Sequence, residues 1–225
     1  MLIRVKYKKI GDISYISHLD VVKLMERIAR RAKLKLAYSE GFNPHPKIAF
    51  SPALQLGVQS ECEFVDMELA DEYDVYDILA LLNEKSIEGI VFTEISEIEY
   101  SNSLVAFITH SVYKIIVSKD NIEEAELISG IESINSHKEI LLTKKSKKGN
   151  ISEYNMKDFV GNIEYQTTED EIILTVEVCS GSEKSINPKK IMEFISESLD
   201  SKEIKYTLIK TDTYKKTSDS IERPL

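Results

Sequence analysis

The sequence is poor in cysteine, with only Cys62 and Cys179 among 225 residues. These two are far apart, so they form neither a metal-ligand spacing nor a disulfide framework, and their strand-like surroundings favour buried free thiols. No apolar run reaches the roughly 18 residues of a membrane span, and the amino terminus lacks the apolar core of a signal peptide. We therefore expect a cytoplasmic protein without a metal, a cofactor or a membrane contact.

A phosphate-binding loop is also missing, because Gly41 and Gly57 are not part of a Gly, four residues, Gly-Lys-Ser or Gly-Lys-Thr pattern. A nucleotide hydrolase is therefore not indicated. The net charge of -9 disfavours nucleic acid for the chain as a whole, but the charge is uneven. Residues 1–60 hold eleven Lys and Arg against four Asp and Glu, or +7, and the remainder carries -16. This asymmetry suggests an anionic partner for the amino-terminal part, with a solvated basic face as the alternative.

The few prolines are concentrated in one stretch. Three of the five, Pro44, Pro46 and Pro52, fall between residues 38 and 63. Asn43 and His45 each precede a proline, which disfavours helical geometry and predicts a stiff, extended loop. A stiff loop loses little entropy when a ligand binds, so Asn43, His45 and Lys47 could form a preorganised polar surface. The alternative is a purely structural turn.

A basic amphipathic helix is predicted directly before this loop. Ser17 is placed as its N-cap, and Asp20 three residues later resembles a capping box. Apolar residues recur at helical spacing and predict a buried stripe of Val21, Val22, Met25, Ile28, Ala29 and Ala32. The opposite face carries Lys23, Arg27, Arg30 and Arg31.

The remaining periodicities predict an α+β protein built from tandem ferredoxin-like units. The first has the order strand (1–9), helix, strand (35–38, with 48–50 as its continuation or as a return strand), strand (61–69, bulged at Phe64–Val65), helix (71–83), strand (87–98). This order leaves one sheet face without helices. The second repeats it as strand (111–117), helix (121–134), strand (139–143), strand (172–179), helix from Pro188 and strand (205–209). The predicted domains are 1–100 and an acidic 104–214, with the boundary near Ser101-Asn102-Ser103 and a disordered tail over 215–225.

The candidate site lies in the first domain. Arginine forks match phosphate oxygens, and exposed aromatic rings can stack on unpaired bases. The predicted nucleic-acid-binding residues are Arg27, Arg30, Arg31, Tyr38, Phe42, Asn43, His45 and Lys47. Phe50 is a further stacking candidate, with a core position as its alternative, and the arginines could instead pair with Asp20 and Glu26.

Catalysis is the competing hypothesis. His18 and His45 are the two histidines of the basic part, and imidazole titrates near working pH, so the pair could cleave RNA as general acid and base. The structural alternative is a locally bonded His18 and a merely exposed His45. Four acids, Asp20, Glu40, Glu61 and Glu63, could bind magnesium, with Glu61 and Glu63 on one side of a strand, but their spacing is not diagnostic. Zinc lacks the required ligands.

Residues 14–69 also resemble a known family. The matching residues are Tyr15-Ile-Ser-His-Leu-Asp20, Arg27, Arg30-Arg31, Tyr38-Ser-Glu-Gly-Phe-Asn-Pro-His-Pro-Lys47, Leu54, Gly57, Ser60 and Glu61. This stretch is similar to the radical S-adenosylmethionine (SAM)-linked protein family, and the similarity beyond about residue 100 is one of segment order. Where that family shows Arg-Pro before its last helix, this chain has Asn187-Pro188. The resemblance implies a radical SAM enzyme as partner, since this chain lacks the three closely spaced cysteines of such an enzyme.

Three functions are therefore open. The preferred hypothesis is an RNA-binding accessory protein that presents transfer or ribosomal RNA to a separate radical SAM enzyme. The first alternative is a metal-independent ribonuclease that uses His18 and His45. The second is a protein interaction module that binds the partner enzyme without contacting RNA. For the acidic second domain the sequence suggests only a scaffold.

Overall fold

The computed structural model describes residues 1–99, 103–145, 149, 151–199 and 204–225, which form a mixed α/β fold of two compact units. Unit 1 comprises Met1–Thr109 with Ile209–Leu225, and unit 2 comprises His110–Leu208. Residues 104–109 and 209–214, predicted for the second domain, thus belong to unit 1. In the predicted boundary, 101 and 102 lie outside the described residues, whereas Ser103 caps a short helix.

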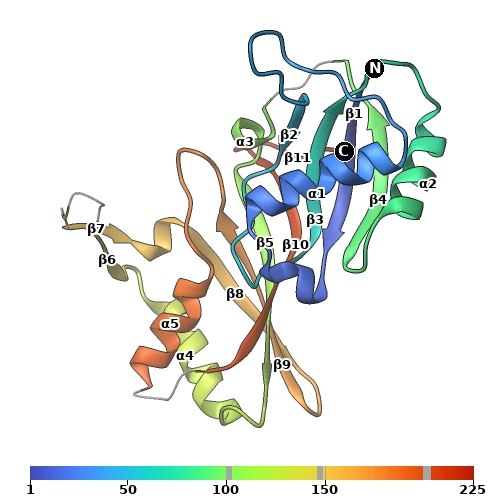
Figure 1. The fold of residues 1–225 in the computed structure, drawn as a ribbon. Helices are drawn as coiled ribbons and strands as arrows, with labels where there is room; N and C mark the ends of the chain where they lie inside the picture. Colours follow the sequence, from blue (N-terminus) through green and yellow to red (C-terminus); the bar gives the residue numbers. More distant parts are fainter. Residues whose placement is uncertain (100–102, 146–148, 150, 200–203) are drawn as a thin grey trace. The chain divides into compact units, whose positions relative to one another are not determined.

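Unit 1 follows the predicted order of elements up to residue 97 (Figure 1). Its elements are β1 (Leu2–Lys9), η1 (Gly11–Tyr15), α1 (His18–Arg31), β2 (Ile48–Phe50), β3 (Gln59–Glu68), α2 (Val75–Lys85), β4 (Ile90–Glu97), α3 (Leu104–Phe107), most of β10 (Tyr206–Lys216) and β11 (Ile221–Glu222). β1 pairs antiparallel with β3 and β4, and β2 pairs antiparallel with β3. β10 runs parallel to β3 through Ile209 and Lys210, so the sheet is mixed.

Helix α1 begins where its sequence predicts. Ser17 Oγ accepts a hydrogen bond from Asp20 N at 3.2 Å and donates one to Asp20 Oδ2 at 2.6 Å. This reciprocal cap satisfies one of the free amides of the first turn. Val21, Met25 and Ile28 are buried as predicted, which fixes the side that faces the sheet.

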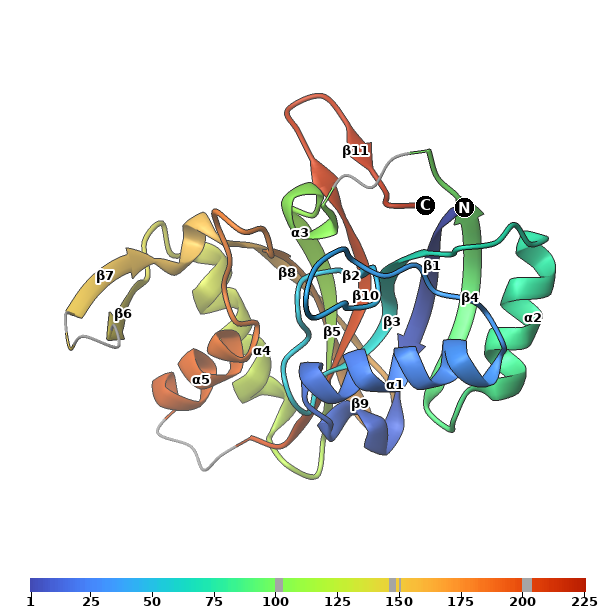
Figure 2. The same cartoon turned by 45° about the horizontal axis from the view of Figure 1, so that its top comes forward.

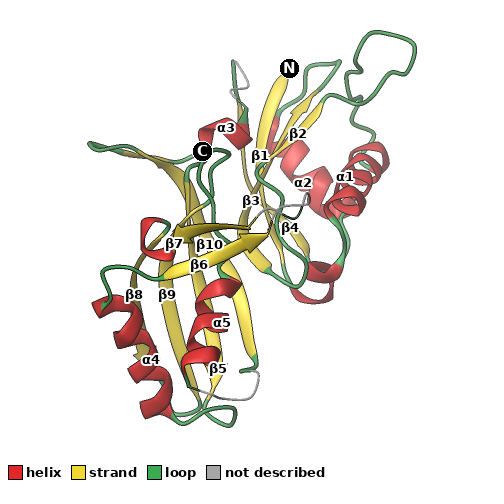
Figure 3. Cartoon of the chain, turned by 90° about the vertical axis from the view of Figure 1, so that its left-hand side faces the viewer, coloured by secondary structure: helices red, strands yellow, loops and turns green. Residues whose placement is uncertain are grey.

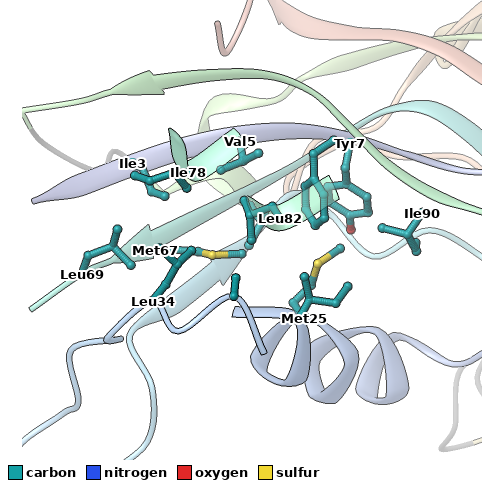
Figure 4. Close-up of a cluster of buried hydrophobic side chains, with 14 of the residues drawn as sticks. Ile3, Val5, Tyr7, Met25, Leu34, Met67, Leu69, Ile78, Leu82 and Ile90 are labelled. Atoms are coloured by element: carbon teal, nitrogen blue, oxygen red, sulfur yellow. The ribbon is translucent and has the colours of Figure 1, made fainter. Parts of the chain in front are cut away.

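The main core of unit 1 lies between the sheet and helices α1 and α2 (Figure 4). Alternate residues of β1, Ile3, Val5 and Tyr7, face it, and Val65 and Met67 of β3 meet them from the paired strand. Fully burying an apolar side chain of this size contributes about 1.5–3 kcal/mol, so this layer fixes the register of both strands.

The other face of this sheet is covered, contrary to the prediction of a face without helices. Cys62 and Phe64 of β3 pack there with Leu104 of α3 and with Leu225. The supposedly disordered tail supplies this cover, because Lys215 and Lys216 of β10 pair with β11 and the chain then reaches Leu225 (Figure 2). Both faces of β3 are apolar and therefore need a partner layer.

Unit 2 departs further from the predicted order (Figure 3). Its elements are β5 (His110–Ser118), α4 (Glu124–Ser136), β6 (Leu141–Lys145), β7 (Ile151–Asn155), η2 (Met156–Asp158), β8 (Val160–Thr167), β9 (Glu171–Cys179), α5 (Lys189–Ser198) and the first residues of β10. β9 pairs antiparallel with β5 and with β8, a strand that was not predicted. The predicted strand 139–143 corresponds to β6, which forms a separate two-stranded sheet with β7. The strand predicted over 205–209 is the start of β10, which continues into unit 1.

A close helix contact holds the core of unit 2. A Cβ atom added to Gly130 of α4 would lie 2.9 Å from Ile195 Cγ2 of α5, so only glycine allows this approach. Ile131 and Ile134 of α4 are fully buried beside it, three positions apart as on one face of a helix.

The bulge in β3 lies earlier than predicted. The pairing with β1 shifts between Tyr7 and Lys9, which oppose Glu63 and Ser60, and it is regular at Phe64 and Val65. Glu61 is exposed whereas Glu63 is buried. The two carboxylates therefore do not form the shared magnesium site considered from the sequence.

Candidate nucleic-acid interface

The carboxyl-terminal half of α1 presents three exposed arginines, Arg27, Arg30 and Arg31. Two of them, Arg30 and Arg31, lie in the last turn, where a cation also suits the negative end of the helix dipole. Within the described part of the chain, no ion pair joins any of the three to a carboxylate. Asp20, considered as their partner, is instead bonded to Ser17. The guanidinium groups are thus free to bind an anion.

A shallow hollow of about 350 Å³ brings one of these arginines next to an aromatic ring. It is lined by Glu26, Arg30, Leu34, Lys35, Leu36, Tyr38 and Ala70. The Tyr38 side chain is 50% exposed, so its ring can accept a stacking partner. Lys35, which was not predicted as a site residue, adds a second cation. Its ammonium bonds Asp71 at 2.7 Å, which raises the pKa of Lys35, but exposed pairs of this kind are weak.

The proline-rich loop is closed by its own backbone. Ser39 N donates to His45 O at 2.9 Å, and His45 N donates to Ser39 Oγ at 3.0 Å. The predicted strand at 35–38 is present only as two isolated bridges, Leu36 to Leu69 and Tyr38 to Pro46. The segment is also held by backbone hydrogen bonds from Ala37 N to Glu68 O, from Lys47 N to Ala37 O and from Ala70 N to Lys35 O, and by the fixed proline φ angles.

The tip of this loop exposes an aromatic side chain to solvent. Phe42 is entirely exposed, and it follows Gly41, whose φ of +121° is disfavoured for residues with a side chain. His45 is exposed as well, with its Nε2 atom 3.2 Å from Asn43 Nδ2. Asn43, His45 and Phe42 therefore lie on one short accessible segment.

Lys47 at the end of the loop is partly engaged. Its Nζ atom lies 2.9 Å from Glu68 Oε1, and both side chains are more than 40% exposed. An exposed pair contributes at most about 1 kcal/mol, so a phosphate can compete for this lysine. All eight predicted contact residues are exposed, and among them the hollow unites Arg30 with Tyr38.

The two histidines of the ribonuclease hypothesis have different surroundings. The His18 ring packs edge-to-face on Phe50 at 5.4 Å between centroids. It lines a cavity of about 10 Å³, room for about one water, with Lys9, Ser51 and Glu63 among its neighbours. In the described residues no contact joins His18 to His45. Phe50 is half-buried and packs against the main core, as its alternative assignment proposed.

A buried charge cluster that was not predicted from the sequence lies beside this cavity. Lys9 Nζ donates to Ser14 O at 3.3 Å and Ile16 O at 3.2 Å. Glu63 accepts from Ser51 Oγ at 3.1 Å and pairs with Lys210 Nζ at 2.5 Å. Burial lowers the pKa of Lys9, and Glu63 opposes this shift. The signal was present, because Lys9 continues the inward-facing alternation of Ile3, Val5 and Tyr7.

Other ligand classes find little support in the described residues. No group of three or more His, Cys, Asp or Glu there is placed to hold a metal ion. Cys62 and Cys179 are free and buried, and burial raises the pKa of Cys62 to about 12. None of the helices in the described ranges combines the length and the apolar character needed for a membrane span.

Comparison with known proteins places the chain in a family. Residues 2–188 match the family model DUF2344, described as an uncharacterized protein conserved in bacteria. The chain belongs to this family. No curated protein matches the DUF2344 chain.

Among solved structures, the DUF2344 chain is similar to a chain in a Cbf5-Nop10-Gar1 complex, at 14% identity and a TM-score of 0.52. The match covers 94% of this chain and 48% of that one, so the present chain spans about half the length of its match. At this identity the likeness concerns the fold alone. A second match, "putative glycine cleavage system transcriptional repressor", is 10% identical over 96% of this chain and 97% of that chain. Its TM-score of 0.22 is too low for a structural argument.

Proposed function

We propose that this protein binds RNA through unit 1 and presents it to a separate radical SAM enzyme. The observation that carries the RNA contact is the set of three exposed, unpaired arginines on α1, of which Arg30 shares a hollow with the exposed Tyr38 ring. Guanidinium groups bind phosphates in a bidentate manner, and a neighbouring ring can stack on an unpaired base. The RNA class we propose is transfer or ribosomal RNA, recognised at an unpaired segment.

We also propose that the chain consists of two ferredoxin-like units in tandem. In unit 1 the pairs β4–β1, β1–β3 and β3–β2 support a ferredoxin-like sheet. In unit 2 the order β5, α4, β8, β9, α5, β10 fits the same pattern if the β6–β7 hairpin is an insertion between α4 and β8. The sheet then serves as a rigid base for α1 and the loop.

The partner enzyme needs its own surface, and we propose the amino-terminal end of α1. Tyr15, Leu19 and Leu56 are each more than half exposed there. Tyr15 packs on Gly57, where an added Cβ would lie 3.2 Å from its ring, and Gly57 N donates to Ser14 O at 3.0 Å. A set of exposed apolar side chains is typical of a protein contact. The similar solved fold is also found in a complex of several proteins.

The RNA contact is tested by the triple change Arg27→Glu, Arg30→Glu and Arg31→Glu. We expect it to abolish binding of a labelled transfer RNA while the circular dichroism spectrum stays that of the parent, because the buried side of α1 is untouched. Each phosphate contact should contribute about 0.7 to the log-log salt slope on a single strand. Three contacts would therefore flatten the slope by about two.

The matched control changes three exposed lysines of unit 2, Lys114, Lys138 and Lys205, to glutamate. It has the same change of charge and should keep most of the affinity. A triple-arginine variant that binds as well as its parent, or a parent affinity independent of salt, would sink the RNA proposal. Capture of the partner enzyme is tested in the same way: capture that resists nuclease, but is lost in the double variant Tyr15→Ser and Leu19→Ser, would then favour the pure interaction module. RNA cleavage in EDTA that is lost in His18→Ala would favour the ribonuclease.

A further inference from the structure

Unit 2 contains a hollow of about 670 Å³ that the proposed function does not use. The β6–β7 hairpin, the residue after η2, the loop after β9 and the first turn of α5 enclose it. Its lining residues are Thr143, Lys144, Ser152, Tyr154, Phe159, Ser182, Glu183, Ser185, Ile186, Asn187 and Lys190. The volume is in the range of small-molecule sites, which are about 300–1,000 Å³.

Two aromatic rings form part of its wall. Tyr154 and Phe159 are half-buried and meet edge to face, with centroids 5.5 Å apart and planes at 81°. The Lys184 ammonium lies 5.0 Å from the Phe159 centroid, which shows that a face of this ring is open to a cation. Lys184 is exposed, so a flat ligand ring can displace it at little cost.

Cations stand beside the aromatic wall. Lys144 is exposed, and Lys190 Nζ lies 2.5 Å from Glu193 Oε2 in a pair whose side chains are 41% and 47% exposed. Glu193 raises the pKa of Lys190, so the lysine is charged at neutral pH. An exposed pair of this type is weak, and an incoming phosphate can replace the carboxylate. Within the lining, Lys144 and Lys190 are accompanied by one acid, Glu183, and Glu193 pairs with Lys190 from outside the lining.

Polar groups suited to a base edge complete the site. Asn187 Oδ1 accepts from Lys189 N at 2.9 Å, whereas its amide nitrogen has no protein partner in the described ranges. An amide donor with a carboxylate acceptor such as Glu183 can pair with the polar edge of a nucleobase. Ser182 and Ser185 add hydroxyl groups at the same rim.

We propose that this hollow binds a nucleoside phosphate, with the base against Tyr154 and Phe159 and the phosphate at Lys144 and Lys190. The inference stands independently of the arginine surface of unit 1. The ligand is either a free nucleotide or one unpaired nucleotide of an RNA, since both present the same base and phosphate.

The test is a titration of the isotope-labelled chain with uridine monophosphate or adenosine monophosphate, in which binding is measured by changes in the amide chemical shifts. We expect the amide shifts to be confined to the lining segments. Uridine, adenosine or inorganic phosphate alone should give a weaker response. The double variant Lys144→Glu with Lys190→Glu should lose at least tenfold in affinity. The matched control, Lys114→Glu with Lys138→Glu, should bind as the parent does. Phe159→Leu, with unchanged circular dichroism, should also lose affinity.

The outcomes of this titration distinguish nucleotide binding in unit 2 from RNA binding by unit 1. Nucleotide binding that survives the triple arginine variant supports the hollow even if unit 1 binds no RNA. Shifts at the lining produced only by a short oligonucleotide also support it and assign the source as RNA. No shift at the lining with either ligand at 5 mM, or shifts produced only by an acidic peptide, would overturn it.

Discussion

Unit 1 buries five charged side chains, Arg4, Lys9, Glu63, Asp66 and Lys210, whereas the only buried polar side chain in the described part of unit 2 is Ser111. The five arginines of the chain, Arg4, Arg27, Arg30, Arg31 and Arg223, also all belong to unit 1. A buried charge is tolerated only when its partners are in place, so unit 1 depends on specific pairs where unit 2 depends on apolar packing. The two units are thus stabilised in different ways.

The largest expected effect comes from removing one buried partner in unit 1. Arg4 Nε and Nη2 bond the two oxygens of Asp66 at 2.7 and 2.8 Å, and Arg4 Nη1 donates to Pro224 O at 3.1 Å. Asp66→Ala leaves Arg4 buried without its carboxylate and should lower the free energy of unfolding by about 3–5 kcal/mol in urea titrations. Glu171→Ala, an exposed acid on β9 of unit 2, should cost less than about 0.5 kcal/mol.

A compensated variant sharpens this result. Arg4→Met with Asp66→Leu removes both charges and should regain more than half of the lost stability, although Pro224 O then lacks its donor. If Asp66→Ala costs no more than Glu171→Ala, the buried pair does not distinguish the units.

The next effect concerns the carboxyl-terminal segment of unit 1. Truncation after Thr217 removes β11, the Pro224 O acceptor and Leu225, which packs with Cys62 and Phe64. We expect a loss of about 2 kcal/mol, because partial leucine burial and the hydrogen bond from Arg4 Nη1 to Pro224 O are lost. Leu225→Ala should reproduce part of this loss, and Ile221→Ala, which is 53% exposed, should be close to neutral. A truncated protein as stable as the parent would instead agree with the predicted disordered tail.

These contacts mark the limit of what the sequence predicts. Ser17, Asp20 and the apolar period defined α1 correctly, because a helix start and its buried side depend on residues within a few positions. The cover of β3 by Leu225 depends on one residue of a mostly polar tail, more than 160 positions from Cys62. The pairing of Arg4 with Asp66 likewise follows from strand register, which the sequence does not specify residue by residue.

The candidate site likewise has residues that the sequence predicts and residues that it does not. Exposure of Arg27, Arg30 and Arg31 followed from helical period, and that of His45 from its proline neighbours. Lys35 was not predicted to line the hollow of Arg30 and Tyr38, because its segment was assigned to a strand. The hollow in unit 2 could not be foreseen, since the β6–β7 hairpin and the loop after β9 meet only in the folded chain.

A smaller effect should appear in the pH dependence of stability. The pKa of Lys9 is lowered from 10.5 by burial, so on a rise in pH the folded state releases this proton before the unfolded state does. Stability therefore gains a contribution that increases as the pH approaches 10.5. Lys9→Met should remove this contribution. In urea titrations between pH 8 and 10.5, the free energy of unfolding of this variant should then rise less with pH than that of the parent. Glu63 opposes the shift, so Glu63→Gln should start the rise at lower pH. Parallel curves for parent and Lys9→Met would contradict the assignment.

The smallest expected effect on stability is at His45, compared with His137 of unit 2. The bonds that close the proline loop use the backbone of His45, namely Ser39 N to His45 O and His45 N to Ser39 Oγ, so alanine keeps them. His45→Ala loses only the contact with Asn43 and should change the free energy of unfolding by less than about 0.5 kcal/mol. His137→Ala, at the exposed end of α4, should be equally mild. The two should differ in RNA affinity, which we expect to fall severalfold for His45→Ala and to stay unchanged for His137→Ala. A loss of several kcal/mol at His45 would instead make the loop a structural turn, and its side chain would then have no role in binding.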